Sequence, residues 1–242
     1  MKEIEGIVIR LTHFRDNDMM VSVLTSEKIL SFLARGVMKI ESKNAPSVNI
    51  YNKSRFTLFS SKDGLSLRNG EIISSYQNAK ESLSTLVVLD FLGEITNRLI
   101  LSEDAPKAYI WLEKCLECLS QGYDPLTIAL IYLGAILRIS GNSLEVDSCL
   151  ICHQKRPIVA MNYSKGGFIC EECLSTLNGS KTPVGELKIL RYIFKVTPKT
   201  LSRVSFDVKD AKHVLKDLEK FIEQQLDISL KSISIMDKTF DK

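Results

Sequence analysis

Four cysteines near the middle of the chain constrain its fold more than any other feature of the sequence. They form two C-x-x-C pairs separated by 17 residues, Cys149 with Cys152 and Cys170 with Cys173. Two such pairs can hold four thiolates tetrahedrally around one metal ion, and Zn²⁺ prefers both this geometry and soft sulfur ligands. Since sulfur would fill all four positions, the pattern predicts one structural Zn²⁺ in a ribbon over residues 149–180.

Two other cysteine motifs compete with this interpretation. Residues 149–153 match the C-x-x-C-H string of haem attachment, but haem leaves the second pair unexplained. Cys115 and Cys118 form a further C-x-x-C pair, inside a segment with helical periodicity. Because Cys115 lies on the apolar stripe of that segment, we expect both thiols in the core and not in a redox site.

The first 79 residues predict a small β-barrel. Short apolar and β-branched runs are separated by turn residues, and Asn69-Gly70 is typical of a turn before the run at 72–73. Five or six short strands in this length favour a closed barrel over residues 1–79. The other expected strands lie near 7–11, 19–25, 29–34, 54–60 and 65–67.

From residue 80 the apolar spacing becomes helical. Start signals such as Asp124-Pro125 support this interpretation, because proline favours the first turn of a helix. We expect two helical parts, 80–148 and 181–242, with the ribbon inserted between them. The expected helices cover 83–99, 104–119, 124–137, 182–194 and 207–226.

Sequence motifs of catalytic sites are missing. The chain has no G-x-x-x-x-G-K, G-x-S-x-G or H-E-x-x-H string, and its three histidines are scattered. We therefore expect no enzymatic activity. The first eleven residues lack the apolar centre of a signal peptide, and the apolar stretch 128–139 is too short to span a membrane. A cytoplasmic protein without membrane contact is expected.

The net charge of +3 is unevenly distributed. Residues 1–79 carry 11 Lys and Arg against 8 Asp and Glu, whereas residues 80–148 carry 5 against 10. Cations mixed with aromatic residues suit single-stranded nucleic acid, although an ordinary solvated barrel face has the same composition. The candidate DNA contacts are Arg10, Arg35, Lys39, Lys43, Arg55 and Arg68.

Four segments of the chain together resemble a known family: residues 5–10 with 18 and 21–25, residues 34–37, residues 166–170 with Cys173, and residues 231–233. The family that they resemble is RecO, a family of bacterial recombination mediators. Their order along nearly the whole chain makes the resemblance specific, although the loop 37–43 is less basic than is usual in the family. The resemblance implies an α+β multidomain fold, with an N-terminal OB-fold barrel and a C-terminal α-helical domain that carries an inserted four-cysteine zinc ribbon.

The same resemblance implies a nucleoid-associated protein that binds single- and double-stranded DNA, anneals SSB-coated strands and, with RecR, helps to load RecA. It also implies contact with the acidic C-terminal tail of SSB. Since residues 80–148 are acidic, lysines of the last long helix are better placed for that tail. These lysines are Lys209, Lys212, Lys216 and Lys220. The alternative hypothesis is a zinc-containing protein–protein scaffold with no significant DNA contact.

Overall fold

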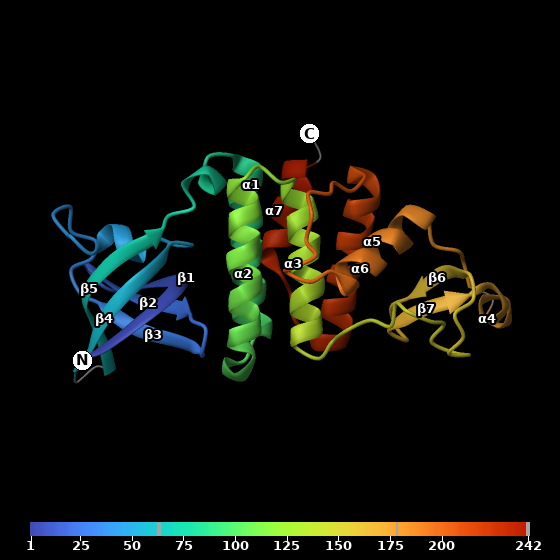
Figure 1. Ribbon diagram of the computed structural model, residues 1–242, viewed down its shortest axis with the longest axis horizontal. Coiled ribbons are helices and arrows are strands. Elements are labelled where there is room, and N and C mark those ends of the chain that lie inside the picture. Colours follow the sequence, from blue (N-terminus) through green and yellow to red (C-terminus); the bar gives the residue numbers. More distant parts are fainter. Residues whose placement is uncertain (62–63, 178, 241–242) are drawn as a thin grey trace.

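The computed structural model describes residues 1–61, 64–177 and 179–240. Three parts follow one another along the long axis of the molecule: a β-barrel, a group of helices and a small β-containing lobe (Figure 1). This arrangement confirms the predicted fold class, an N-terminal barrel followed by a helical region that carries the four-cysteine cluster.

Five strands close the N-terminal barrel in the order β1-β2-β3-β5-β4. Neighbouring strands run antiparallel, except β3 and β5, which run parallel. This is the connectivity of an OB-fold. The strands are β1 (Lys2–Arg15), β2 (Asp18–Leu24), β3 (Ile29–Ala34), β4 (Lys53–Ser61) and β5 (Gly64–Ser74).

The predicted turn at Asn69-Gly70 is wrong, because both residues lie inside the continuous strand β5. Gly70 pairs there with Phe56 of β4. A glycine is needed for space, since a Cβ at this position would collide with the side-chain oxygen of Ser47. Ser47 belongs to the 3₁₀ helix η1 (Ala45–Val48), so Gly70 lets η1 lie directly against β5.

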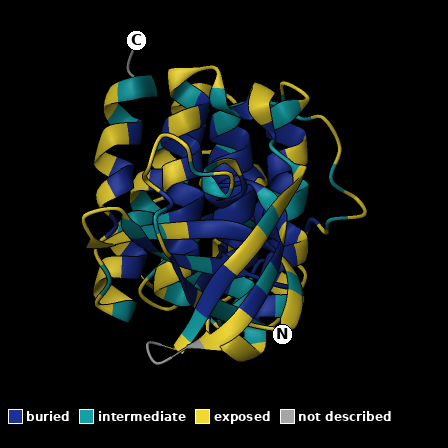
Figure 2. Ribbon diagram, turned by 90° about the vertical axis from the view of Figure 1, so that its left-hand side faces the viewer, coloured by how far each residue is buried: buried dark blue, intermediate teal, exposed yellow. Residues whose placement is uncertain are grey.

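Strand β1 connects two hydrophobic cores. The interior of the barrel contains Phe32 and Phe56, whose ring centroids are 5.0 Å apart. Residues 6–9 of β1 are all buried, although a strand with one wet face should alternate. Their burial has a simple cause: Ile7 and Ile9 belong to the core of the helical region, so this part of β1 is covered on both faces. Seen from the barrel end, buried residues alternate with exposed ones along the near strands (Figure 2).

Helix α3 (Pro125–Ile139) lies at the centre of the helical region. All of its residues from Leu126 to Leu137 are buried. Helices α1, α2, α5 and α6 contact it. Their bounds are α1 (Leu83–Leu99), α2 (Ala105–Ser120), α5 (Val184–Lys195) and α6 (Val208–Leu226), and the short 3₁₀ helices η2 (Gln77–Lys80) and η3 (Ser102–Asp104) precede α1 and α2.

All five helices expected from the sequence are present. Three of them begin after a side chain that accepts a hydrogen bond from the backbone three residues further on, namely Ser82, Asp124 and Asp207. Of these three caps, Asp124 belongs to the start signal Asp124-Pro125, whereas the helices after Ser82 and Asp207 were expected from their apolar spacing. Over the part of the chain that the structure describes, no helix has the length and apolar character needed to cross a membrane.

Helix α7 (Lys231–Phe240) was not predicted. Its first turn is capped from α1: the Glu94 carboxylate accepts hydrogen bonds from the Lys231 N–H at 3.1 Å and from the Ser232 N–H and hydroxyl at 2.9 and 2.6 Å. Burial alone would raise the pKa of Glu94, but the bonds from Ser232 and Lys231 bring it below its usual value. A cap so distant in sequence leaves no local signal.

Candidate functional site

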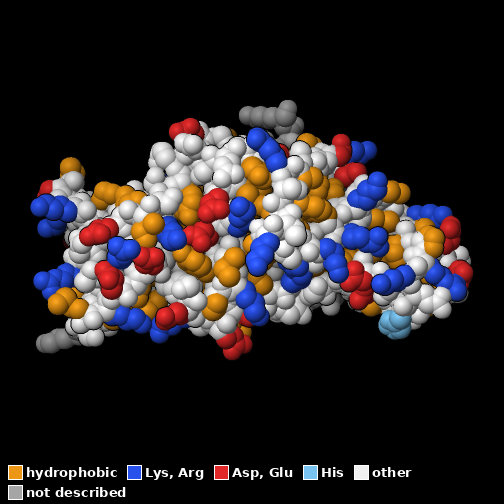
Figure 3. Space-filling model, in the orientation of Figure 1, with side chains coloured by type: hydrophobic (Ala, Val, Ile, Leu, Met, Phe, Trp, Pro, Cys, Tyr) orange, Lys and Arg blue, Asp and Glu red, His pale blue; other side chains and the backbone are white. Residues whose placement is uncertain are grey.

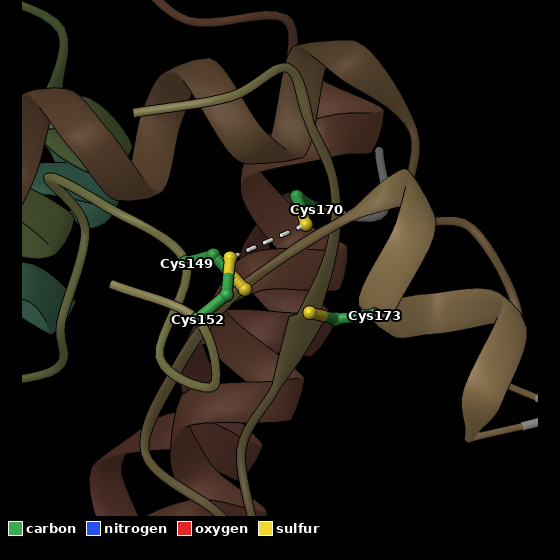
Figure 4. Close-up of side chains that lie close together, drawn as sticks. All are labelled: Cys149, Cys152, Cys170 and Cys173. Atoms are coloured by element: carbon green, nitrogen blue, oxygen red, sulfur yellow. Dashed lines mark hydrogen bonds between the residues drawn. The ribbon is translucent and has the colours of Figure 1, made fainter. Parts of the chain in front are cut away.

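The four predicted metal ligands converge in the lobe formed by residues 149–180, hereafter the cysteine lobe. Their sulfur atoms all lie within 4.8 Å of one another. Cys149 and Cys170 are buried, and Cys152 and Cys173 are half-buried. The close-up shows the four side chains turned toward a common centre from the two ends of the lobe (Figure 4). This arrangement could hold one metal ion.

Two tight turns bring the cysteine pairs together. In the first, His153 adopts a left-handed φ of 56° and its N–H donates to the Cys149 carbonyl at 2.8 Å. In the second, Gly166 has a φ of 81° and links β6 (Ile158–Asn162) to β7 (Gly167–Cys170), as a glycine permits. The short helix α4 (Glu171–Thr176) then carries Cys173 back toward the first pair.

The electrostatics of the cluster favour a bound cation. Burial raises the pKa of Cys149, but backbone N–H groups of Cys152, Cys170 and Ile151 outweigh it and lower the pKa to about 6. The pKa of Cys173 is instead raised to about 12, through desolvation and contacts with the other thiols. Four thiolates cannot coexist here at neutral pH without a compensating charge, which a divalent ion supplies.

The remaining cysteine pair lies outside this cluster. Cys115 and Cys118 are buried on α2, and burial raises the pKa of the Cys115 thiol well above its usual value. Both are core residues, as the position of Cys115 on the apolar stripe predicted. A raised thiol pKa disfavours the thiolate, which is the form that binds metals and reacts.

Three of the six candidate DNA contacts lie together on one loop of the barrel. Arg35, Lys39 and Lys43 belong to residues 35–44, between β3 and η1, hereafter the cation loop. Arg68 of β5 is next to its end, because the Asn44 side chain donates to the Arg68 carbonyl at 3.2 Å. The three loop cations and the backbone of Arg68 therefore lie at one end of the barrel, and the Arg68 guanidinium donates to the Met1 sulfur.

Two candidate DNA contacts lie elsewhere. Arg55 on β4 forms an exposed ion pair with Glu5 on β1, with 2.7 Å between Nη2 and Oε1. Arg10 lines a cavity of about 680 Å³ between the barrel and the helices, where Asp90 and Glu94 also lie. Arg98 and Lys231 line the same cavity, so its cations outnumber its acids. The ion pair with Glu5 weakens the pull of Arg55 on a phosphate.

The four lysines suggested for an acidic tail are on α6, and three of them share one depression. Lys209, Lys212 and Lys216 line a cavity of about 160 Å³ with His213 and Asp237. Lys216 lies 3.6 Å from the Asp237 carboxylate. Lys220 lies outside the depression and is 3.7 Å from Asp217.

Sequence reasoning missed an apolar groove between the cysteine lobe and α5. Its volume is about 700 Å³, and its apolar walls include Phe168 from the lobe and Leu187 from α5. Lys188, Arg191 and Lys195 line it as well. Their spacing of three and four residues places them on one face of α5. This spacing is the sequence feature from which a cationic helix face could have been predicted. Arg191 is held in place, since its guanidinium lies 5.3 Å from the Phe168 ring centroid.

These features define a class of protein: an OB-type barrel joined to a helical region with an inserted four-cysteine lobe. Residues 1–76 match the family model described as Recombination protein O N terminal, and residues 80–233 match Recombination protein O C terminal. The DNA repair proteins RecO of Bacillus mycoides and Bacillus cereus are each 29% identical over 237 residues, which cover 96% of this chain and 94% of theirs. The chain belongs to the RecO family of DNA repair proteins, which confirms the resemblance.

Proposed function

We propose that this chain is a non-enzymatic recombination mediator that binds single- and double-stranded DNA through its barrel. The observation that carries the proposal is the grouping of Arg35, Lys39 and Lys43 on the cation loop, with Arg68 beside it. Phosphate contacts require cations that are held together on one surface. We assign DNA binding to residues 1–79 and a supporting role to the helical parts 80–148 and 181–242.

Neutralisation of phosphates gives this surface a mechanism for annealing. Two strands repel each other until their charges are screened, and bound lysines and arginines provide that screening locally. As a member of the RecO family, the chain would anneal SSB-coated strands and, with RecR, help to load RecA in the cytoplasm at the nucleoid. Arg55 would contribute less than the cation loop, because it is paired with Glu5, and Arg10 lies apart from that loop, in the cavity against α1.

The metal we propose is a single structural Zn²⁺ held by Cys149, Cys152, Cys170 and Cys173. Among the residues of the lobe that the structure describes, its own hydrophobic cluster has three buried members, Ala160, Ile169 and Leu174, while Phe168 belongs to the core of the helical region. A core of this size cannot hold a lobe together, and metal ligation supplies the missing free energy. Sulfur at every ligand position leaves no place for a reacting group.

For the acidic C-terminal tail of SSB we propose the depression on α6 that Lys209, Lys212 and Lys216 line, with Lys220 nearby. The groove beside α5 is the competing location, since it combines cations with an apolar surface. Both locations carry cations that attract an acidic tail, so replacing lysines in each of them distinguishes the two.

The test of the DNA proposal is the salt dependence of binding to a single-stranded oligonucleotide, measured by fluorescence anisotropy. We expect a linear fall of log affinity with log salt, with a slope that decreases by about one for each of Lys39→Gln and Lys43→Gln. The alternative, a zinc-containing protein–protein scaffold without significant DNA contact, predicts no binding even at low salt.

A further inference from the structure

The cation loop carries two exposed apolar side chains, Met38 and Ile40, hereafter the apolar tip, which serve no purpose in the fold. Ile40 has a relative exposure of 104%, and Met38 of 48%. An isoleucine stabilises a protein by leaving water, so a side chain this exposed contributes nothing to folding. Met38 and Ile40 flank Lys39, and Lys43 follows three residues after Ile40. Apolar and cationic side chains therefore share one short segment.

Hydrogen bonds to residues 17 and 18, and one within the loop, hold the cation loop in place. The Gly36 N–H donates to the Asp18 carboxylate at 2.7 Å, and the Met38 N–H to the Asn17 carbonyl at 3.1 Å. The Ser42 N–H donates to the Lys39 carbonyl at 3.0 Å, and Val37 is buried in the barrel core. The tip is therefore presented in a fixed position, which lowers the entropic cost of a contact.

The last residues of β1 add an aromatic side chain to the same end of the barrel. Phe14 lies at a bulge between His13 and Arg15 and is 42% exposed. The Arg15 guanidinium lies 5.0 Å from the centroid of the Phe14 ring. At this end of the molecule, hydrophobic side chains lie next to Lys and Arg side chains (Figure 3).

The partner that fits this mixture is an anionic chain with exposed apolar faces. Single-stranded DNA has both, since its phosphates meet cations and its unstacked bases meet apolar or aromatic side chains. A duplex hides the faces of its bases and offers the tip only phosphates, sugars and base edges. Asp18 is an acidic residue near the loop, and its carboxylate is already engaged because it accepts a hydrogen bond from the Gly36 N–H.

We infer that Ile40 and Met38 contact the faces of unstacked bases in single-stranded DNA while Lys39 and Lys43 hold the phosphates, with Phe14 available at the same end of the barrel. The inference rests on the proposed DNA binding and adds to it a base contact. Such a contact favours the single-stranded over the paired state, and it lets the barrel hold bases apart until a second strand arrives.

The test compares Ile40→Ser with the wild type on three labelled ligands: oligothymidylate, an abasic oligonucleotide of the same length, and a blunt duplex. We expect Ile40→Ser to weaken oligothymidylate binding about fivefold, with an unchanged salt slope, because no phosphate contact is lost. Binding to the abasic strand and the duplex should not change. Ile40→Leu should retain binding, and Ile110→Ser, at an exposed site on α2, is the matched control.

Three results would overturn the inference. Equal affinity of Ile40→Ser and wild type for oligothymidylate would show that the tip meets no base. An equal loss on the abasic strand would assign the effect to the backbone, and loss of RecR binding with unchanged DNA affinity would make the tip a protein contact. If the wild type bound no DNA at all, the proposed function would fail first, and that result is distinguishable from the other three.

Discussion

The backbone N–H of Gly36 donates a hydrogen bond of 2.7 Å to the carboxylate of Asp18. This bond joins the cation loop to the start of β2. Gly36 has a φ of 61°, in the left-handed region that glycine tolerates, and this sets the direction in which the loop leaves β3. The position of the loop cations thus depends on an acidic residue that would itself repel DNA.

Replacing Asp18 should separate its two effects, repulsion of DNA and support of the loop. Asp18→Asn removes the charge but keeps an oxygen acceptor for Gly36, whereas Asp18→Ala removes both. We expect the alanine variant to bind single-stranded DNA about threefold more weakly than the asparagine variant and to be less stable by about 1 kcal/mol. Anisotropy and urea unfolding give the two numbers, and equal affinities would show that the hydrogen bond does not position the cations.

Loss of one metal ligand should unfold the cysteine lobe. In Cys170→Ser the bound zinc should fall from about one per chain to near zero, because three thiolates and a hydroxyl bind zinc far more weakly. Metal analysis after dialysis and the melting temperature measure the result. Cys118→Ala is the control, since Cys118 is buried on α2 outside the cluster and should leave the zinc content unchanged. Full zinc occupancy in Cys170→Ser would contradict a four-cysteine site.

The cap on α7 should make stability depend on pH in the acidic range. The folded-state pKa of Glu94 is below its ordinary value, so the ionised carboxylate stabilises the fold above that value. This contribution disappears as the pH falls through the lowered folded-state pKa. We expect Glu94→Gln to melt at a lower temperature than wild type at neutral pH, and the difference to shrink once the pH is below that lowered pKa. A gap that stays constant with pH would exclude the carboxylate as its cause.

Charge reversal on two helices should locate the site for the acidic tail. Lys212→Glu combined with Lys216→Glu should weaken binding of an SSB-tail peptide by about tenfold, because two attractive contacts become repulsive. Lys188→Glu on α5 should have little effect. Titration calorimetry with the peptide measures both, and the reverse order of effects would move the site to the groove beside α5.

The sequence predicted those helices and that cluster whose signals lie in a short stretch of residues. The cysteine spacing located the cluster, and the start signal Asp124-Pro125 located the start of α3. The two failures have long-range causes. The local pattern predicts a turn at Gly70, but the small size of this residue accommodates Ser47 within a strand, and α7 depends on Glu94 far away in sequence.

The candidate DNA contacts divide in the same way. Arg35, Lys39 and Lys43 are near one another in sequence, so the fold could scarcely separate them. Arg55 is paired with Glu5 because β4 and β1 are adjacent in a particular register, which no single-sequence pattern determines. The groove beside α5 needs contributions from the lobe and the helix together, and only the folded chain unites them.

The most direct test of the central claim is strand annealing on SSB-coated DNA, with and without RecR. The variant is the triple replacement of Arg35, Lys39 and Lys43 by glutamine, and Arg55→Gln is the matched control on another part of the barrel. We predict annealing by the wild type and by Arg55→Gln, and a loss of at least about tenfold in rate for the triple variant. Annealing at the wild-type rate by a folded triple variant would contradict the assignment of DNA binding to the cation loop.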